Sequence, residues 1–199
     1  TALSSLYCDG NQLTALDVSR NGELEELQCQ VNQMTSLDLG ANTKLRILKC
    51  YGNQLTSLNI RNTPALTVLN CDDNQLTALD VSWNPGLTKL SCRNNCLTML
   101  AVNGNPALNQ LICDENQLTS LDTSGCTQMT YLSCGNNQLA CLIIGKNSVL
   151  TTLSCGYNEL SDLDLTDLSA LDYIYCVGNN LTSLNLSGNP VLRKLYCSG

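Results

Sequence analysis

The chain has 199 residues, including 13 cysteines and no histidine, and its formal net charge is −7. An acidic chain is a poor electrostatic partner for nucleic acid or an anionic membrane surface, and no apolar run approaches the ~20 residues of a membrane helix. The absence of histidine removes the commonest general base and metal ligand. We therefore expect no nucleic-acid partner, no membrane insertion, no cofactor and no enzymatic activity.

The cysteines reveal an internal repeat, which is the dominant feature of the sequence. Ten of them recur at intervals of 21 residues: Cys8, Cys29, Cys50, Cys71, Cys92, Cys113, Cys134, Cys155, Cys176 and Cys197. With Leu3 as position one, nine full repeats cover 3–191 and a partial repeat covers 192–199. Residues 1–199 are thus one repeat domain. Because no capping sequence is visible at either end, we expect the chain to be a fragment of a larger protein.

Each repeat predicts two short elements in the same order. The first half reads L-x-x-L-x-C-x-x-N, and the second reads L-T-x-L-D-V-S-x-N. Their alternation of period two favours extended chain, and neither half has the 3.6-residue period or the length of a helix. We predict a parallel strand around each L-x-C segment, a second extended, 3₁₀ or β segment around L-x-V, and a ladder of the position-nine asparagines. The predicted strand segments, in chain order, are 6–8, 27–29, 48–50, 69–71, 90–92, 111–113, 132–134, 153–155, 174–176 and 195–197.

The pattern L-x-x-L-x-C-x-x-N-x-L resembles the leucine-rich repeat, with cysteine in place of the third leucine. The 21-residue length and the nested halves are similar to the short bacterial subclass of that family. The resemblance implies a mainly β, right-handed solenoid with a parallel sheet on one face and little or no helix. It also implies binding of proteins, or of glycans or lipids, and a cell-surface or secreted location in a bacterium. A cytoplasmic location stays open, because unpaired cysteines favour a reducing compartment.

The cysteine column could in principle hold metal or form disulfides. Adjacent Cβ atoms in a parallel stack lie ~4.8 Å apart, whereas a disulfide requires ~3.8 Å, and a straight row cannot surround one zinc ion. We interpret the column as small buried side chains that fill a narrow core.

An acidic column at position fifteen offers a second possible ion site. Its members are Asp17, Asp38, Asp80, Asp122 and Asp164, with Asn59 and Asn185. Calcium needs six to eight convergent oxygen ligands, and Ala101 and Ile143 interrupt the column. We therefore predict a solvated outer row and no metal site.

Tyrosines mark the candidate binding surface. Leucine at position four and cysteine at position six point inward, so positions three, five and seven point outward. Six of the seven tyrosines occupy these outward positions, and none occupies a core position. We propose a binding patch near the C-terminal end, with small residues between aromatic walls, formed by Tyr131, Tyr173, Tyr175, Lys194 and Tyr196. Tyrosines that only stabilise an open sheet face are the alternative.

Two functions follow from these patterns. One is a non-enzymatic binding module that recognises a protein or a glycan through the exposed face of the sheet. The other is a structural spacer or stalk in a bacterial surface protein, with no ligand on this segment. The outward residues of the first half vary from repeat to repeat while the second half keeps T-x-L-D, which favours binding.

Overall fold

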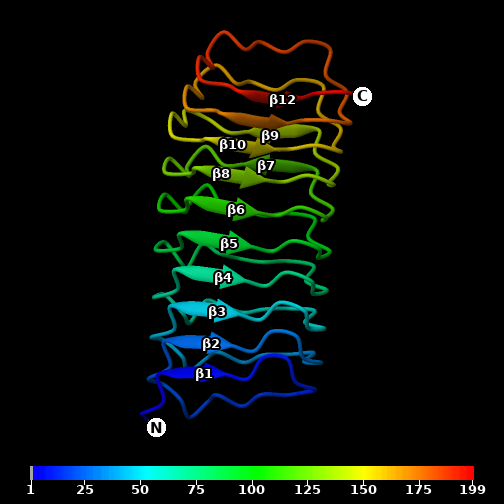
Figure 1. Ribbon diagram of the computed structural model, residues 1–199. Coiled ribbons are helices and arrows are strands. Elements are labelled where there is room, and N and C mark those ends of the chain that lie inside the picture. Colours follow the sequence, from blue (N-terminus) through cyan, green and yellow to red (C-terminus); the bar gives the residue numbers. More distant parts are fainter. Residues whose placement is uncertain (1) are drawn as a thin grey trace.

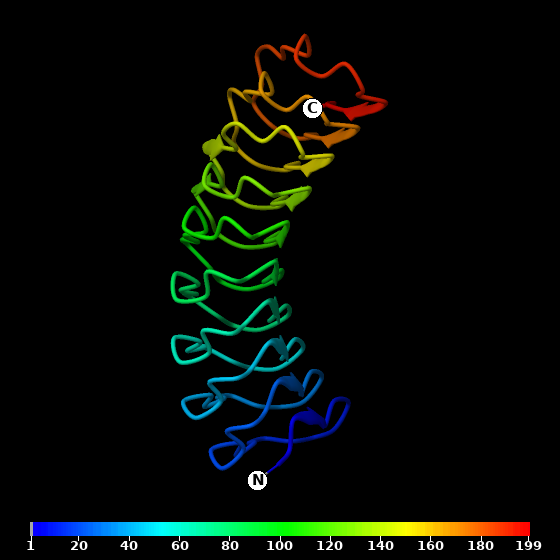
Figure 2. The ribbon, with the colours of Figure 1, turned by 90° about the vertical axis from the view of Figure 1, so that its left-hand side faces the viewer.

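The computed structural model describes residues 2–199 as a solenoid in which each 21-residue repeat forms one rung (Figure 1). The predicted mainly β, right-handed solenoid of the leucine-rich repeat type is confirmed, and the described residues contain no helix. Figure 2 shows the stack bending gently, with the main sheet on its concave side.

Ten three-residue strands, one per rung, form a single parallel sheet. Each strand pairs with the next at an offset of 21 residues, for example Ser5 with Glu26, so the sequence repeat sets the register directly. The strands occupy positions three to five and end immediately before the cysteine, one residue earlier than the L-x-C pattern predicts. They are β1 (Ser5–Tyr7), β2 (Glu26–Gln28), β3 (Ile47–Lys49), β4 (Val68–Asn70), β5 (Lys89–Ser91), β6 (Gln110–Ile112), β8 (Tyr131–Ser133), β10 (Thr152–Ser154), β11 (Tyr173–Tyr175) and β12 (Lys194–Tyr196).

The second halves of the repeats form the opposite face, which we call the second face. Among the described residues only two strands pair there, β7 (Ser120–Asp122) and β9 (Cys141–Ile143), and Figure 2 shows them on the side away from the main sheet. A single additional bridge joins Asp80 to Ala101 within residues 2–199. The second half is therefore mostly extended chain without a β-ladder.

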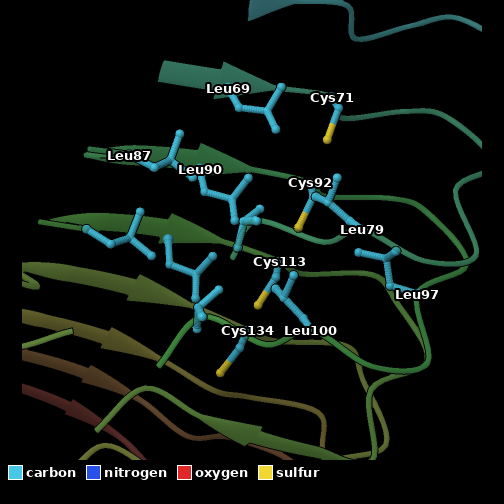
Figure 3. Close-up of a cluster of buried hydrophobic side chains, with 14 of the residues drawn as sticks. Leu69, Cys71, Leu79, Leu87, Leu90, Cys92, Leu97, Leu100, Cys113 and Cys134 are labelled. Atoms are coloured by element: carbon cyan, nitrogen blue, oxygen red, sulfur yellow. The ribbon is translucent and has the colours of Figure 1, made fainter. Parts of the chain in front are cut away.

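The core is a narrow file of leucine and cysteine side chains between the two faces. Figure 3 shows the sulfur atoms of Cys71, Cys92, Cys113 and Cys134 stacked in one row. The eight ladder cysteines from Cys29 to Cys176 are buried, and every described cysteine is a free thiol, as the packing interpretation predicts. Desolvation raises the pKa of the Cys29 and Cys155 thiols to about 12.

The predicted asparagine ladder is present at position nine. Asn95 shows the pattern: its Nδ2 donates to the carbonyl oxygens of Cys71 and Cys92, each at 3.1 Å, and its Oδ1 accepts from the Leu76 N–H at 2.9 Å. One side chain thus satisfies three backbone groups on two rungs. A second asparagine ladder at position nineteen is weaker. Asn105, for example, donates to the Val81 and Asn84 carbonyls, but its buried Oδ1 has no protein partner.

The two ladders predict unequal mutational costs. Asn95→Ala leaves the buried Leu76 N–H without its acceptor, while the Cys71 and Cys92 carbonyls keep the bonds that Asn74 and Asn116 donate to them. Asn105→Ala removes donor bonds only. Since each buried polar group left unpaired costs about 1–3 kcal/mol, we expect Asn95→Ala to lower the free energy of unfolding by about 1–2 kcal/mol more than Asn105→Ala. Urea denaturation measures both, and hydrogen exchange should accelerate most in rungs four to six. Equal losses in the two variants would contradict the assigned roles.

The buried thiols predict a loss of stability in alkali. Cysteine ionises near pH 9 in the unfolded chain, while desolvation raises the pKa of folded Cys126 and Cys176 to about 11 and those of Cys29 and Cys155 to about 12. Above pH 9 the unfolded state therefore binds fewer protons, so stability is complete below pH 9 and falls as the pH rises toward 11 and beyond. Each thiol contributes about 1.4 kcal/mol per pH unit within that window.

Denaturation under reducing conditions between pH 8 and pH 11 measures this slope. Cys92→Ala removes a buried ladder thiol and should make the slope shallower, whereas Cys141→Ala removes an exposed thiol and should leave it unchanged. The same pH dependence in both variants would show that burial of the ladder thiols is not the cause.

Candidate functional site

The candidate site lies on the concave sheet, across its last four strands. The register places Tyr131, Thr152, Tyr173 and Lys194 in one row at position three. Tyr175 pairs with Tyr196 in the adjacent row at position five. All five candidate residues thus belong to one face of one sheet, because successive outward positions repeat at the same offset in each rung.

Four tyrosine rings, which we call the tyrosine cluster, contact one another in a chain. The ring centroids of Tyr157 and Tyr175 are 6.3 Å apart, those of Tyr175 and Tyr196 are 6.0 Å apart, and those of Tyr196 and Tyr173 are 5.8 Å apart. The interplanar angles are 45–51°. Such tilted arrangements are favourable because they bring the positive edge of one ring toward the negative face of the next. The rings therefore restrain one another while Tyr157 and Tyr196 stay exposed.

Tyr157 is the member that sequence reasoning missed. It occupies position eight, one residue beyond the outward strand positions, where the chain turns with a positive φ of 55°. The left-handed conformation costs residues other than glycine about 1–2 kcal/mol, yet all nine rungs adopt it at position eight. The residue there is glycine at Gly10, Gly52 and Gly178, and in the other rungs besides that of Tyr157 it is Val31, Asp73, Asn94, Glu115 and Asn136. The sequence shows Tyr157 only as a large residue at a turn position, and it does not show that the ring contacts the cluster.

Two glycines lie beneath rings of the tyrosine cluster. A Cβ atom built on Gly156 would lie 2.4 Å from Cε1 of Tyr175, and one built on Gly178 would lie 2.8 Å from Cδ1 of Tyr157. The ring of Tyr175 therefore packs against Gly156 of the preceding rung, and the ring of Tyr157 packs against Gly178 of the following rung. The surface they create is a shallow aromatic platform, because the absent side chains allow the rings to approach the backbone.

The remaining two candidates border this platform. Tyr131 is half-buried two rungs away from Tyr173, with Thr152 between them, and makes no ring contact in the described residues. Lys194 lies beside Tyr173 in the register and lines a hollow of about 250 Å³ with Asp172 and Arg193. The guanidinium of Arg193 donates hydrogen bonds to both carboxylate oxygens of Asp172, and these bonds lower the pKa of Asp172. Lys194 itself makes no ion pair in the described residues.

Tyr175 remains protonated and uncharged at neutral pH. A side-chain hydrogen bond with Tyr157, together with desolvation, raises the pKa of Tyr175 above its ordinary value. A neutral ring that carries a hydroxyl offers both an apolar face and a hydrogen-bonding group. The platform is therefore suited to contact with a ligand.

The acidic column at position fifteen has a local structural role. Asp80 Oδ1 accepts from the Ser82 N–H at 3.0 Å, and Asp122 Oδ1 accepts from the Ser124 N–H at 2.9 Å. The same bond to position seventeen recurs at Asp17, Asp38, Asn59, Asp164 and Asn185. These are Asx turns, and within residues 2–199 no group of three or more His, Cys, Asp or Glu side chains could hold a metal ion. The described chain likewise contains no helix able to cross a membrane.

Solved structures share this architecture. The functional domain of InlJ from Listeria monocytogenes, which includes a cysteine ladder, is 33% identical over 98% of this chain and 53% of its own, with a TM-score of 0.77. InlF, an internalin from the same species, is 21% identical over 98% of this chain and 67% of its own, with a TM-score of 0.75. The chain thus spans about half the length of the InlJ domain.

The fold also occurs in the complex of TLR13 with ssRNA13, at 20% identity, with a TM-score of 0.77, over 98% of this chain and 32% of TLR13; this match shows the fold alone. No family model and no curated protein matches the sequence. The similarity to InlJ includes the feature that distinguishes the core, a ladder of cysteines. The chain has the leucine-rich repeat fold, and the short-repeat subclass that carries a cysteine ladder fits it.

Proposed function

We propose that the protein acts by binding, without catalysis, and that it recognises a partner protein through the tyrosine cluster on the concave sheet. The observation that carries this proposal is the chain of contacts from Tyr157 through Tyr175 and Tyr196 to Tyr173. Rings that already restrain one another lose little entropy on contact, and tyrosine is enriched at interaction hot spots. Tyr131 and Lys194 extend the same surface along position three.

The packing of the cluster supports binding over a purely structural role. Tyr7 illustrates the structural alternative: its hydroxyl donates to Glu26 on the next rung at 2.9 Å, which is a cross-strand contact of the stabilising kind. In the cluster, by contrast, the contacts are between aromatic rings, which join Tyr157 to Tyr175 and Tyr196 to both Tyr175 and Tyr173. Four rings gathered in one place offer an aromatic area that a single cross-strand tyrosine does not, so a role in a binding surface is the better explanation.

The ligand class rests on charge and on the character of the surface. The fold can accommodate RNA, as the complex of TLR13 with ssRNA13 demonstrates for that protein. The net charge of −7 on this chain opposes a polyanion, and we therefore propose a protein ligand, with a glycan as the other class to be tested. The internalin resemblance favours a bacterial cell-surface or secreted setting as part of the same proposal.

Replacement of three cluster tyrosines should remove binding and spare the fold. In the variant Tyr173→Ala, Tyr175→Ala, Tyr196→Ala, each lost ring is an outward residue, so the core is unchanged. We expect ligands captured by the wild-type chain on protein and glycan arrays to bind at least about 2 kcal/mol more weakly, as at a hot spot. Circular dichroism should report an intact solenoid.

A matched control lies on the same sheet far from the cluster. Tyr7→Ala, Tyr51→Ala removes two outward tyrosines of the first three rungs and should retain every interaction of the wild type. The array that yields the ligand decides between a protein and a glycan. Equal binding by the triple variant and the wild type, or no captured ligand at all, would favour the spacer role instead.

A further inference from the structure

The second face carries an apolar surface where the repeat pattern fails. Position fifteen is Asp or Asn in seven repeats, and each of these side chains forms an Asx turn. Rungs five and seven instead have Ala101 and Ile143, with Met99 and Cys141 two residues earlier. All four side chains are exposed, and we call them the second-face patch.

The stability of the fold does not explain the patch. Met99 is 77% exposed, whereas Met34 and Met129 are completely buried in the core. Ile143 is 49% exposed at a position where seven other rungs gain a hydrogen bond to aspartate or asparagine. The backbones of Ala101 and Ile143 do pair with Asp80 and Asp122 on the second face, but this pairing does not require an apolar side chain. Exposed apolar side chains gathered in this way are typical of an interaction site. A flexible methionine is moreover well suited to adapt to a partner.

Hollows lie on both sides of Met99 and beside Ile143. One of about 290 Å³ lies against rung four and is lined by Ala78, Asp80 and Met99. A second, of about 320 Å³, lies against rung six, where Ser120 and Asp122 line it. A third, of about 390 Å³, is lined by Ile143 with Lys146, Asp164 and Asp167. The patch therefore offers projecting apolar groups and concave spaces that a partner's side chains can fill.

The charge around these hollows identifies the chemistry of the partner. Their linings contain four carboxylates, Asp80, Asp122, Asp164 and Asp167, but only one cation, Lys146. Hydrogen bonds from Ser82 and Ser124 lower the pKa of Asp80 and Asp122, which keeps both charged at neutral pH. A second copy of this chain would bring further negative charge to the same place. Apolar anchors within an acidic rim instead match a segment with apolar side chains next to lysine or arginine.

We propose that the second-face patch docks a basic, apolar-anchored segment of a partner protein. The segment places apolar side chains against Met99 and Ile143, and its cations lie beside Asp122 and Asp164. This surface is separate from the tyrosine cluster, because it lies on the side of the solenoid away from the main sheet (Figure 2). The solenoid thus has one candidate binding surface on the main sheet and another on the second face.

Methionine-methyl NMR provides a direct test on the full chain. The protein has three methionines, so ¹³C-methyl labelling gives three signals, of which buried Met34 and Met129 serve as internal references. The probe is a capped synthetic peptide in which leucine and lysine alternate, added under reducing conditions. We expect a saturable shift of the Met99 signal alone. Peptides with serine for leucine, or with glutamate for lysine, should bind about tenfold more weakly or not at all.

A substitution that restores the repeat pattern separates apolar docking from simple charge attraction. Ile143→Asp places at rung seven the residue that position fifteen has in five other rungs, so the fold should be retained. Attraction between charges alone would tighten peptide binding to this more acidic variant, whereas loss of the apolar anchor should weaken it about tenfold. The triple variant of Tyr173, Tyr175 and Tyr196 should bind the peptide as the wild type does.

Three results would overturn the proposal. One is a Met99 signal that does not move at millimolar peptide. The second is equal or tighter binding by Ile143→Asp. The third is a Met99 shift that depends on protein concentration without peptide, since that would indicate self-association through the patch. None of these outcomes bears on the proposed role of the tyrosine cluster, because that role concerns the opposite face and is tested with the triple tyrosine variant.

Discussion

The bond network of the position-nine asparagines is the constraint on which the rest of the solenoid depends. A parallel stack of three-residue strands leaves many backbone groups at the end of each strand without partners, and buried groups of this kind are costly. From Asn32 to Asn179, each asparagine amide bonds to two cysteine carbonyls and one N–H across two rungs, as Asn95 does for Cys71, Cys92 and Leu76. These bonds fix the turn after each strand, in which position eight adopts the left-handed conformation. The turn in this way sets the direction of the outward residues of the first half.

The difference between the two ladders explains why the two faces differ. Position-nine asparagines use both donor and acceptor, and no other residue occurs there in the nine repeats. At position nineteen the Oδ1 atoms of Asn42, Asn84 and Asn105 are buried without protein partners, and threonine, cysteine and leucine substitute at Thr63, Cys126 and Leu168. A ladder that bonds to fewer groups imposes less order, so the second face of the described chain has only two paired strands and accepts exceptions such as Ile143.

A uniform frame of this kind makes functional residues recognisable as departures from the repeat. The buried columns are under the same packing demand in every rung, so variation there is small. The outward columns carry no such demand, and the tyrosine cluster and the second-face patch are the places where large side chains gather despite exposure. Catalysis needs several different groups that converge on one point, whereas a ladder of like residues spreads each group along a line. A repeat scaffold is therefore better suited to extended contact surfaces.

The sequence alone determined the repeat length, the parallel register, the asparagine ladder and the inward direction of the cysteines, because a 21-residue period places each residue directly beside its equivalent in the next rung. It also placed Tyr173, Tyr175 and Tyr196 on one face by strand alternation. Only the tertiary structure decided that Tyr157 joins them, that Tyr175 lies down on Gly156, and that Tyr131 stays apart. These contacts depend on ring orientation, on a left-handed backbone turn and on the space left by glycine, none of which a residue pattern specifies. The role of the acidic column as Asx turns was likewise invisible until the backbone N–H of position seventeen was seen to point at each carboxylate.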